Sequence, residues 1–174
     1  VGYHDSISFK RLPIPFACVS DNIVNGSKVV FHNGILATAM RASMSIPGVF
    51  APVYLNGKVL VDGGLIDNYP VDIARQMGAE IIIGVDVQNP LMKADELTSL
   101  SSVLGQIINL VGEESYRKNV EDSNIHIQVD VDGYSAASFN HEALDTLMRR
   151  GKEAAMKDWE KLIALKKEIG IGAD

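Results

Sequence analysis

An apolar run that leads directly into an Asp-Gly-Gly turn constrains the fold of this chain more than any other feature. Residues 58–61 read Lys-Val-Leu-Val, which predicts a buried strand, and residues 62–64 follow without a break. Two adjacent glycines allow a tight turn and the close approach of another chain segment. Because ligand sites in open α/β sheets lie outside the carboxyl ends of the strands, a functional residue is expected at this turn.

Strand and helix patterns alternate along the chain, which predicts an α/β protein with a mixed sheet covered by helices. Asn-Gly pairs at 25–26 and 56–57 predict hairpins over 23–31 and 53–61. The run 80–85 is apolar on both faces, as expected of a central parallel strand. The other expected elements are strands over 15–20 and 125–131 and helices over 36–44, 70–77, 97–120 and 141–169, the last capped by Asn140.

Each of the two long helices is expected to bury an apolar stripe against the sheet. In the helix over 97–120 the stripe consists of Leu100, Leu104, Ile107, Ile108 and Val111. An acyl pocket or a bilayer contact is the alternative role for this first stripe. In the helix over 141–169 the stripe consists of Leu144, Leu147, Met148, Ala155, Trp159, Leu162 and Ile169.

Composition excludes several classes of function. A chain of 174 residues that is 47% hydrophobic and 22% charged is ordinary for one globular domain. Its net charge of −6 and the lack of a basic stripe argue against a nucleic-acid partner. The single cysteine, Cys18, excludes an internal disulfide, and the four histidines lack metal-ligand spacing. No Gly-rich phosphate-binding motif occurs, so neither a metal nor a nucleotide cofactor is expected.

Three aspartates end predicted strands: Asp21, Asp62 and Asp86. Topology alone does not show which of the three is functional, but the residues around Asp62 favour that one. A strand-end carboxylate flanked by Val61 and Leu65 is expected to be partly desolvated, which raises its pKa from about 4 toward neutral pH. Such a group suits a general base held within about 3 Å of a nucleophile. The alternative is a turn residue whose carboxylate accepts hydrogen bonds from nearby backbone N–H groups.

Four motifs resemble the C-terminal half of the patatin-like phospholipases, in that family's order and spacing. They are residues 39–43 (Ala-x-Arg-Ala-Ser), 46–50 (Ile-Pro-Gly-x-Phe), 61–64 (Val-Asp-Gly-Gly) and 68–70 (Asn-x-Pro). Residues 139–143 and the helix after them are similar to the tail of bacterial members. The resemblance implies a three-layer α/β/α sandwich with a mixed, mainly parallel sheet. Residues 1–174 would then be the C-terminal portion of a single patatin-like domain, with its N-terminal part missing upstream of Val1.

That family consists of lipid acyl hydrolases with a Ser–Asp dyad, so the resemblance implies that Asp62 is the dyad carboxylate. The family's serine motif, Gly-x-Ser-x-Gly, and its Gly-rich oxyanion loop lie upstream of these motifs, and neither occurs in this sequence. The chain would therefore supply half of an active site. The implied partners are a lipid ester substrate, a peripheral membrane contact, and the missing N-terminal half or another chain. The bacterial cytoplasm and the cell envelope both remain open as locations.

Other residues in these motifs are expected to serve the structure. Arg41 is expected to pair with a carboxylate and Asn68 to cap the helix that begins near Pro70, while Ser43 also matches the pattern; a substrate contact is the alternative for all three. Residues 133–137 imitate a nucleophile elbow around Ser135, but the next helix begins too late, which favours a loop. His126, on the polar face of its strand, is expected to be solvated.

Two non-enzymatic functions remain open at this point. One is a patatin-like module without catalysis that binds lipid or a protein partner. The other is a generic α/β binding domain that shares only the Asp-Gly-Gly turn. If the first strands of the sheet are missing, a sheet edge and an apolar helix face are left uncovered, so the isolated chain is expected to aggregate or oligomerise.

Overall fold

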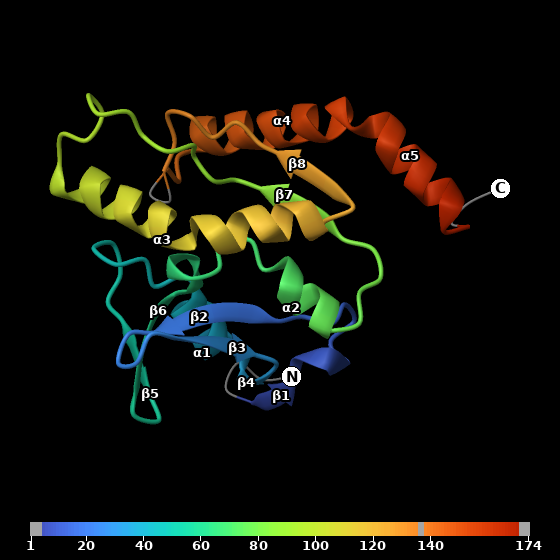
Figure 1. Cartoon of the computed structure of the whole chain (residues 1–174). Coiled ribbons are helices and arrows are strands. Elements are labelled where there is room, and N and C mark those ends of the chain that lie inside the picture. The colour runs from blue at the N-terminus through green and yellow to red at the C-terminus, as the bar shows by residue number, and fades with distance from the viewer. Residues whose placement is uncertain (1–4, 136–137, 171–174) are drawn as a thin grey trace. The chain divides into compact units, whose positions relative to one another are not determined.

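The computed structural model describes residues 5–135 and 138–170, which form a mixed α/β protein with several sheets and helices (Figure 1). The described chain divides into two compact units. The first unit contains residues up to 73 together with 91–119, and the second contains residues 74–90 together with those from 120 onward. The expected α/β class is confirmed.

A four-stranded antiparallel sheet is the centre of the first unit. Its order is β3-β2-β6-β5, formed by β2 (Cys18–Asn22), β3 (Ser27–Phe31), β5 (Val53–Leu55) and β6 (Lys58–Asp62). The turn between β5 and β6 confirms the predicted second hairpin, since Asn56 and Gly57 have φ of 49° and 74°. Two consecutive left-handed residues form the tight turn that suits the twist of a hairpin. A short antiparallel pair, β1 (Ser6–Ser8) with β4 (Asn33–Ile35), was not predicted.

The first hairpin differs from its prediction in register. Its first strand is β2, and Ile23 and Val24 lie exposed in the turn rather than in a strand. Only Gly26 has a positive φ, 70°. The turn is longer than two residues because Asn25 Oδ1 accepts hydrogen bonds from the Ser27 backbone and hydroxyl, at 3.2 and 2.7 Å. Such side-chain bonds to nearby backbone stabilise turns that a two-residue pattern does not anticipate.

The helices of the motif region form where the sequence predicts them. Helix α1 spans Leu36–Ser43 and ends at Met44, ahead of Pro47. Helix α2 spans Val71–Gln76, directly after Pro70, and ends at Gly78, whose φ is 96°. Around β2 and β6 the core contains one aromatic and several aliphatic side chains: Phe9, Val19, Ala39, Ala42, Leu60 and Val61.

Helix α3 (Leu100–Asp122) exposes its predicted apolar stripe except for the half-buried Ile108, so the expectation of burial is wrong for the other four residues. Leu100, Ile107 and Val111 are 77%, 51% and 65% exposed. Among the described residues, the buried ones of α3 are Gly112 and Asn119, and Tyr116 between them places its ring 5.9 Å from that of Tyr69. At Gly112 the helix backbone lies near the Asp-Gly-Gly turn, since a Cβ placed there would make an ordinary contact, 3.8 Å from the Gly64 carbonyl oxygen.

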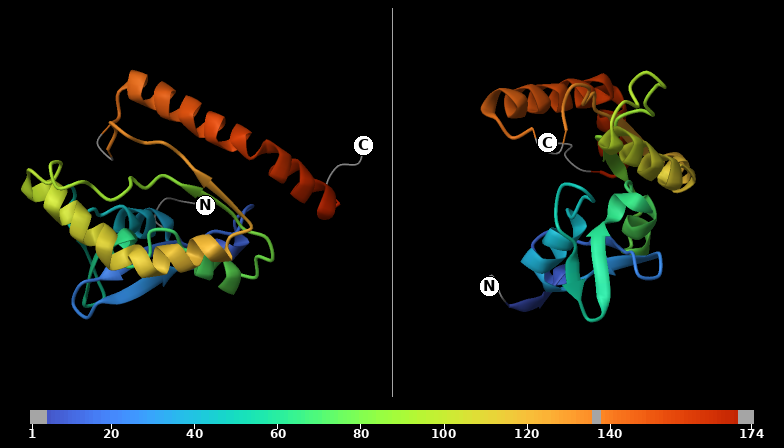
Figure 2. Two further views of the ribbon diagram at one scale, coloured as in Figure 1. Left: turned by 45° about the horizontal axis from the view of Figure 1, so that its top comes forward. Right: turned by 90° about the vertical axis from the view of Figure 1, so that its left-hand side faces the viewer.

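The second unit contains the parallel pair β7 (Ile83–Asp86) and β8 (Ile125–Gln128). Helix α4 (His141–Lys157) lies along β8, and α5 (Trp159–Glu168) follows it (Figures 1 and 2). Asn140 caps α4 as predicted, because its Oδ1 accepts from the Ala143 N–H at 2.8 Å. The core here contains Ile125, Ile127, Val129 and Ala154, with Val131, Ala155, Leu162 and Leu165 packed against it.

Three expectations about this unit are wrong. The helix over 141–169 is interrupted at Asp158, which accepts from the Lys161 ammonium at 2.6 Å as the second helix begins. Four residues of the stripe that was expected to be buried are exposed: Leu144, Met148, Trp159 and Ile169. Ile83 and Val85, expected to be buried in a central strand, are also exposed, and β7 pairs only with β8 among the strands that the structure describes.

The mainly parallel sheet that the resemblance implied is not seen in the described residues. Only β7 and β8 are parallel, and every other strand pair is antiparallel. Two-residue and four-residue turns can only join antiparallel neighbours, whereas a parallel pair needs a long connection, which α3 helps to provide. None of the described helices is both long enough and apolar enough to cross a membrane.

Candidate active site

Asp62 is the last residue of β6 and the N-cap of the short 3-10 turn η2 (Gly63–Leu65). Its Oδ1 accepts a hydrogen bond from the Gly64 N–H at 2.8 Å. Its own N–H donates to the Ser45 carbonyl oxygen at 3.0 Å. Asp62 is therefore held by one hydrogen bond to its carboxylate and one from its backbone, as the turn-residue interpretation expects and as a positioned base also requires.

The two glycines after Asp62 are needed because of close contacts and not because of a left-handed backbone. Neither is among the residues with positive φ. A Cβ on Gly63 would lie 2.6 Å from the Val19 carbonyl oxygen, which is a steric clash with β2. A Cβ on Gly64 would lie 2.8 Å from Asn68 Oδ1 and 3.0 Å from Asp62 Oδ1. The predicted close approach of another chain segment is thus confirmed.

Burial raises the pKa of the Asp62 carboxyl, and the hydrogen bond from the Gly64 N–H only partly offsets this effect. The direction agrees with the sequence-based expectation for a carboxylate at this strand end. In the part of the chain that the structure describes, no group donates to Asp62 Oδ2. A half-buried carboxylate with a raised pKa and one uncommitted oxygen is chemically suited to accept a proton.

Asp21 lies one strand away, buried on β2 with only 2% of the residue exposed. Its Oδ2 accepts from the Ile66 N–H at 3.0 Å, directly after η2, and its buried Oδ1 has no partner among the described residues. Burial raises the pKa of Asp21 to about 7, the Ile66 N–H opposes the rise, and the charges of Asp62 and Asp67 add to it. Two of the three predicted strand-end aspartates therefore lie at the same turn.

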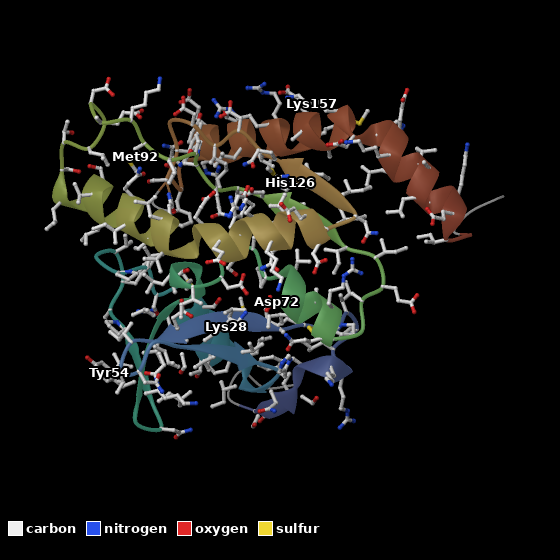
Figure 3. All side chains as sticks on the ribbon, viewed as in Figure 1. Lys28, Tyr54, Asp72, Met92, His126 and Lys157 are labelled. Carbon is white, nitrogen blue, oxygen red and sulfur yellow. The ribbon has the colours of Figure 1, made fainter. Side chains whose placement is uncertain are left out.

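A partly buried ion cluster beside the turn, in which only Asp67 is fully buried, was missed by the sequence reasoning. Lys28, on β3, places its ammonium 2.6 Å from Asp67 Oδ2 and 2.8 Å from Asp72 Oδ2 (Figure 3). The other oxygen of Asp67 accepts from Asn119 Nδ2, on α3, at 3.1 Å. One signal was available: a lysine within the apolar run of β3 is rarely buried unless it is paired.

The two carboxyl groups of this cluster have pKa values shifted in opposite directions. Burial and the hydrogen bond with Asp72 raise the pKa of Asp67, although Lys28 acts in the opposite direction. Burial also acts to raise the pKa of Asp72, but hydrogen bonds with Lys28 and Asp67 outweigh it and the pKa is lowered. Burial alone would lower the pKa of Lys28, yet the two carboxylates raise it. The ammonium therefore stays charged between the two carboxyl groups.

Arg41 has the structural role that was expected but not the expected partner. It donates to Ser45 Oγ at 2.5 Å and to the Ala51 carbonyl oxygen at 2.9 Å, and it lies over the Phe50 ring at 5.5 Å. It pairs with no carboxylate among the described residues. Arg41 thereby holds the segment whose Ser45 carbonyl accepts the Asp62 N–H.

The other two motif residues lie on either side of the same region. Asn68 is exposed and makes no capping bond to α2 within the described chain, so that prediction is wrong; its amide lies beside Gly64 instead. Ser43 hydrogen-bonds the Cys18 thiol. Burial raises the pKa of Cys18 to about 11, and the Ser43 bond offsets this rise only in part.

The remaining candidates belong to the second unit. Asp86 is buried, accepts from the Gln88 N–H at 2.8 Å and lies 3.1 Å from His126 Nε2, so His126 is paired and not merely solvated as predicted. Ser135 lies in a loop, as expected, and its N–H donates to Ser138 Oγ; residues 136–137 of the elbow-like segment lie outside the described residues. No cluster within the described ranges has the ligands for a metal ion.

Comparison with known proteins identifies one matching family model and several relatives of this chain. Residues 5–75 match the family model of the patatin-like phospholipases. An NTE-family protein of Mycobacterium tuberculosis is 37% identical over 81 residues, which is 47% of this chain and 22% of that protein. Lysophospholipase NTE1 of Meyerozyma guilliermondii is 35% identical over 96 residues, 52% of this chain and 7% of that protein. Patatin-like phospholipase domain-containing protein 7 of Rattus norvegicus is 36% identical over 95 residues, which is 49% of this chain and 7% of that protein.

The matched part of the chain spans about a fifth of the length of the mycobacterial relative and less of the other two. The segment 5–75 contains β2, β6 and the Asp62 turn, together with Lys28, Asp67 and Asp72. The resemblance inferred from the four motifs is confirmed: residues 5–75 match the model of the patatin-like phospholipase family, and the relatives named above align with about half of the chain.

Proposed function

We propose that this chain carries the aspartate half of a lipid acyl hydrolase that uses a Ser–Asp dyad, with Asp62 as the base. The observation that carries the proposal is the Asp62 carboxylate itself, which is half-buried, raised in pKa and fixed at a strand end, with Oδ2 uncommitted. The family match and the name of one relative, a lysophospholipase, support the substrate class.

In this mechanism a serine on a part of the domain outside these 174 residues attacks the carbonyl carbon of a lipid ester. Asp62 Oδ2 takes the hydroxyl proton as the new C–O bond forms. Collapse of the tetrahedral intermediate breaks the ester bond, and the leaving alcohol takes up a proton from Asp62. Water, deprotonated in turn by Asp62, then hydrolyses the acyl-enzyme and regenerates the serine. Backbone N–H groups of a Gly-rich loop, also outside this chain, stabilise the oxyanion.

The same proposal extends to fold and partners. The missing N-terminal part would complete a three-layer α/β/α sandwich with a mainly parallel sheet, so that residues 1–174 form one portion of a single patatin-like domain. A peripheral membrane contact would bring the enzyme to its lipid substrate. The exposed apolar side chains of α3 support such a contact, because no charged residue lies between Leu100 and Gly112.

The test is ester hydrolysis by the full-length protein, wild type against Asp62→Asn. Asn is nearly isosteric with Asp but cannot accept a proton at neutral pH, so activity should fall by about 10³-fold or more. Circular dichroism and the melting temperature check that the variant folds. Asp95→Asn, an exposed carboxylate of the same unit, is the matched control and should leave activity unchanged.

A second function, a patatin-like module that binds lipid or a protein without catalysis, is favoured by one observation. The apolar face of α3 is exposed beside the turn and offers a binding surface whether or not a serine is present. An inactive wild-type protein that still binds lipid vesicles, or an Asp62→Asn variant as active as wild type, would favour this second function over the first.

A further inference from the structure

We propose that Asp67, clamped between Lys28 and Asn119, is a positioning residue that holds the Asp62 turn in its working geometry. The inference rests on the proposed function, because it assigns to the clamp an effect on catalysis by Asp62. It concerns residues of the first unit alone, which come from β3, α3 and the segment after η2.

Lys28 and Asn119, which together are called the clamp, donate hydrogen bonds to the two oxygens of the buried Asp67 carboxylate. The Asp67 side chain is fully buried, with the Lys28 ammonium 2.6 Å from Oδ2 and the Asn119 amide 3.1 Å from Oδ1. Lys28 is held in turn by Asp72, on α2, at 2.8 Å. A carboxylate bound from two directions cannot rotate without losing a charge-assisted hydrogen bond, so its backbone position is fixed as well.

Backbone hydrogen bonds connect the clamp to Asp62 over a short distance. The Asp67 N–H donates to the Gly63 carbonyl oxygen at 2.9 Å, and the Ile66 N–H lies 3.3 Å from the same oxygen. Gly63 follows Asp62 directly and is packed against the Val19 carbonyl. Any shift of Asp67 is therefore transmitted through Gly63, and Asp62 Oδ2 moves relative to a nucleophile that it must reach within about 3 Å.

Loss of Lys28 would leave Asp67 buried without its cation. An unpaired buried charge is strongly unfavourable, so the carboxyl group must take up a proton or move toward water. Either response weakens the interactions through which Asp67 holds the Asp62 turn in place. Loss of Asn119 removes only one neutral donor, and it should produce the same effect in a smaller degree because Lys28 remains in place.

The first experiment measures kcat and KM for ester hydrolysis by the full-length protein. Lys28→Met and Asn119→Leu should lower kcat by about 100-fold and about 10-fold while KM stays within about twofold, because misplacement by an ångström is enough for losses of this size. Lys28→Arg, which keeps the charge, should retain more activity than Lys28→Met. Lys10→Met, an exposed lysine with no ion pair among the described residues, is the matched control and should behave as wild type.

The second experiment separates positioning from a general loss of structure. The same substitutions are made in the Asp62→Asn background, and residual turnover is measured with a fluorogenic ester. If the clamp acts through Asp62, Lys28→Met and Asn119→Leu should have no further effect on kcat there. Equal losses in both backgrounds would overturn the clamp but leave the dyad intact. An Asp62→Asn variant as active as wild type would overturn the proposed function and the clamp with it.

Thermal melting accompanies both experiments, and Asn119→Leu keeps the test valid if Lys28→Met fails to fold. A folded Asn119→Leu variant with wild-type kcat would contradict the inference, because its amide is one of the two groups that grip Asp67.

Discussion

At the scale of single residues, the two carboxylates Asp21 and Asp62 lie on neighbouring strands but differ in their partners. Asp62 has one uncommitted oxygen within reach of solvent, whereas Asp21 is buried and has an unpartnered Oδ1. The charge of Asp62 also raises the pKa of Asp21. As pH rises, Asp62 therefore loses its proton before Asp21 does.

Activity should depend on pH through Asp62. In the proposed mechanism Asp62 acts as a base only when it is deprotonated, and burial raises its pKa above the ordinary value of 3.8. The acidic limb of kcat/KM should therefore fall at a higher pH than an unperturbed aspartate would give. A pH–rate profile of the full-length enzyme measures this limb. A limb centred at or below pH 3.8 would contradict the desolvated base.

Stability should depend on pH through Asp21. Its pKa rises from 3.8 in the unfolded chain to about 7 in the fold, so the folded protein holds a proton that the unfolded chain releases. The contribution of Asp21 to stability is thus present below pH 3.8 and lost as pH rises to about 7. The Asp21→Asn variant has no carboxyl group at this position, so its stability does not fall in this way. Between pH 3.8 and about 7 its free energy of unfolding relative to wild type should therefore rise by up to about 4 kcal/mol.

Urea denaturation of wild type and Asp21→Asn at several pH values between 4 and 8 measures the difference. A difference between the two proteins that does not vary with pH would show that Asp21 titrates alike in the folded and unfolded chains.

Gly63 should tolerate no side chain. A Cβ there meets the Val19 carbonyl oxygen at 2.6 Å, so Gly63→Ala forces β2 and β6 apart and should cost about 1–3 kcal/mol. Gly105, inside α3, is the matched control because its Cβ would meet only the Met92 methyl group, at 3.8 Å. Gly105→Ala should be neutral or stabilising by up to about 1 kcal/mol. Urea denaturation distinguishes the two, and a Gly63→Ala variant as stable as wild type would contradict the close approach.

The sequence was informative about single residues wherever one local pattern determined the environment. A carboxylate at the end of an apolar strand and before two glycines was expected to be desolvated, and the pKa of Asp62 is indeed raised. The partners of Asp67 were not foreseeable in this way. Lys28 and Asn119 come from positions 39 and 52 residues distant, and no local pattern relates them.

At the scale of elements, local rules predicted the helix ends better than the strand ends. Asn140 caps α4 and Gly78 follows α2, because capping depends on one side chain or one φ angle. The hairpin at Asn25 shifted its register because side-chain hydrogen bonds lengthened the turn. The apolar stripe of α3 predicted the helix but the wrong face, since the face that is buried carries Gly112 and Asn119, and Asn119 hydrogen-bonds Asp67.

Removal of the α4 cap should destabilise the second unit. Asn140→Ala leaves the Ala143 N–H without its acceptor and should cost about 1 kcal/mol. Asn140→Ser keeps a capping oxygen and should cost a few tenths of that amount. Chemical denaturation followed by the Trp159 fluorescence of α5 measures both variants. Equal stabilities for the alanine and serine variants would mean that the cap contributes nothing.

At the scale of the whole molecule, the 174-residue chain should associate with itself. Three apolar side chains alternate along the β7 strand region and are exposed: Ile83 (48%), Val85 (58%) and Val87 (62%). In the described residues, β7 also has a strand neighbour on one side only. An apolar strand with an open edge is a template for pairing with another chain.

Light scattering after size-exclusion chromatography should show a mass that grows with concentration. Val85→Lys places a charge on the exposed face of β7 and should reduce the association, whereas Leu100→Lys on α3 should leave any pairing through β7 in place. A monodisperse monomer at all concentrations would contradict the prediction.

The buried state of Cys18 has a practical consequence for spectroscopy. Only the thiolate reacts readily with maleimides, and a pKa of about 11 keeps nearly all of this thiol protonated at neutral pH. Cys18 is also the only cysteine of the chain. A cysteine introduced at an exposed position, such as Asn68 beside the turn, should therefore take up a fluorescent or spin label selectively in the native protein. The movement of the Asp62 turn could then be followed without first removing the native thiol.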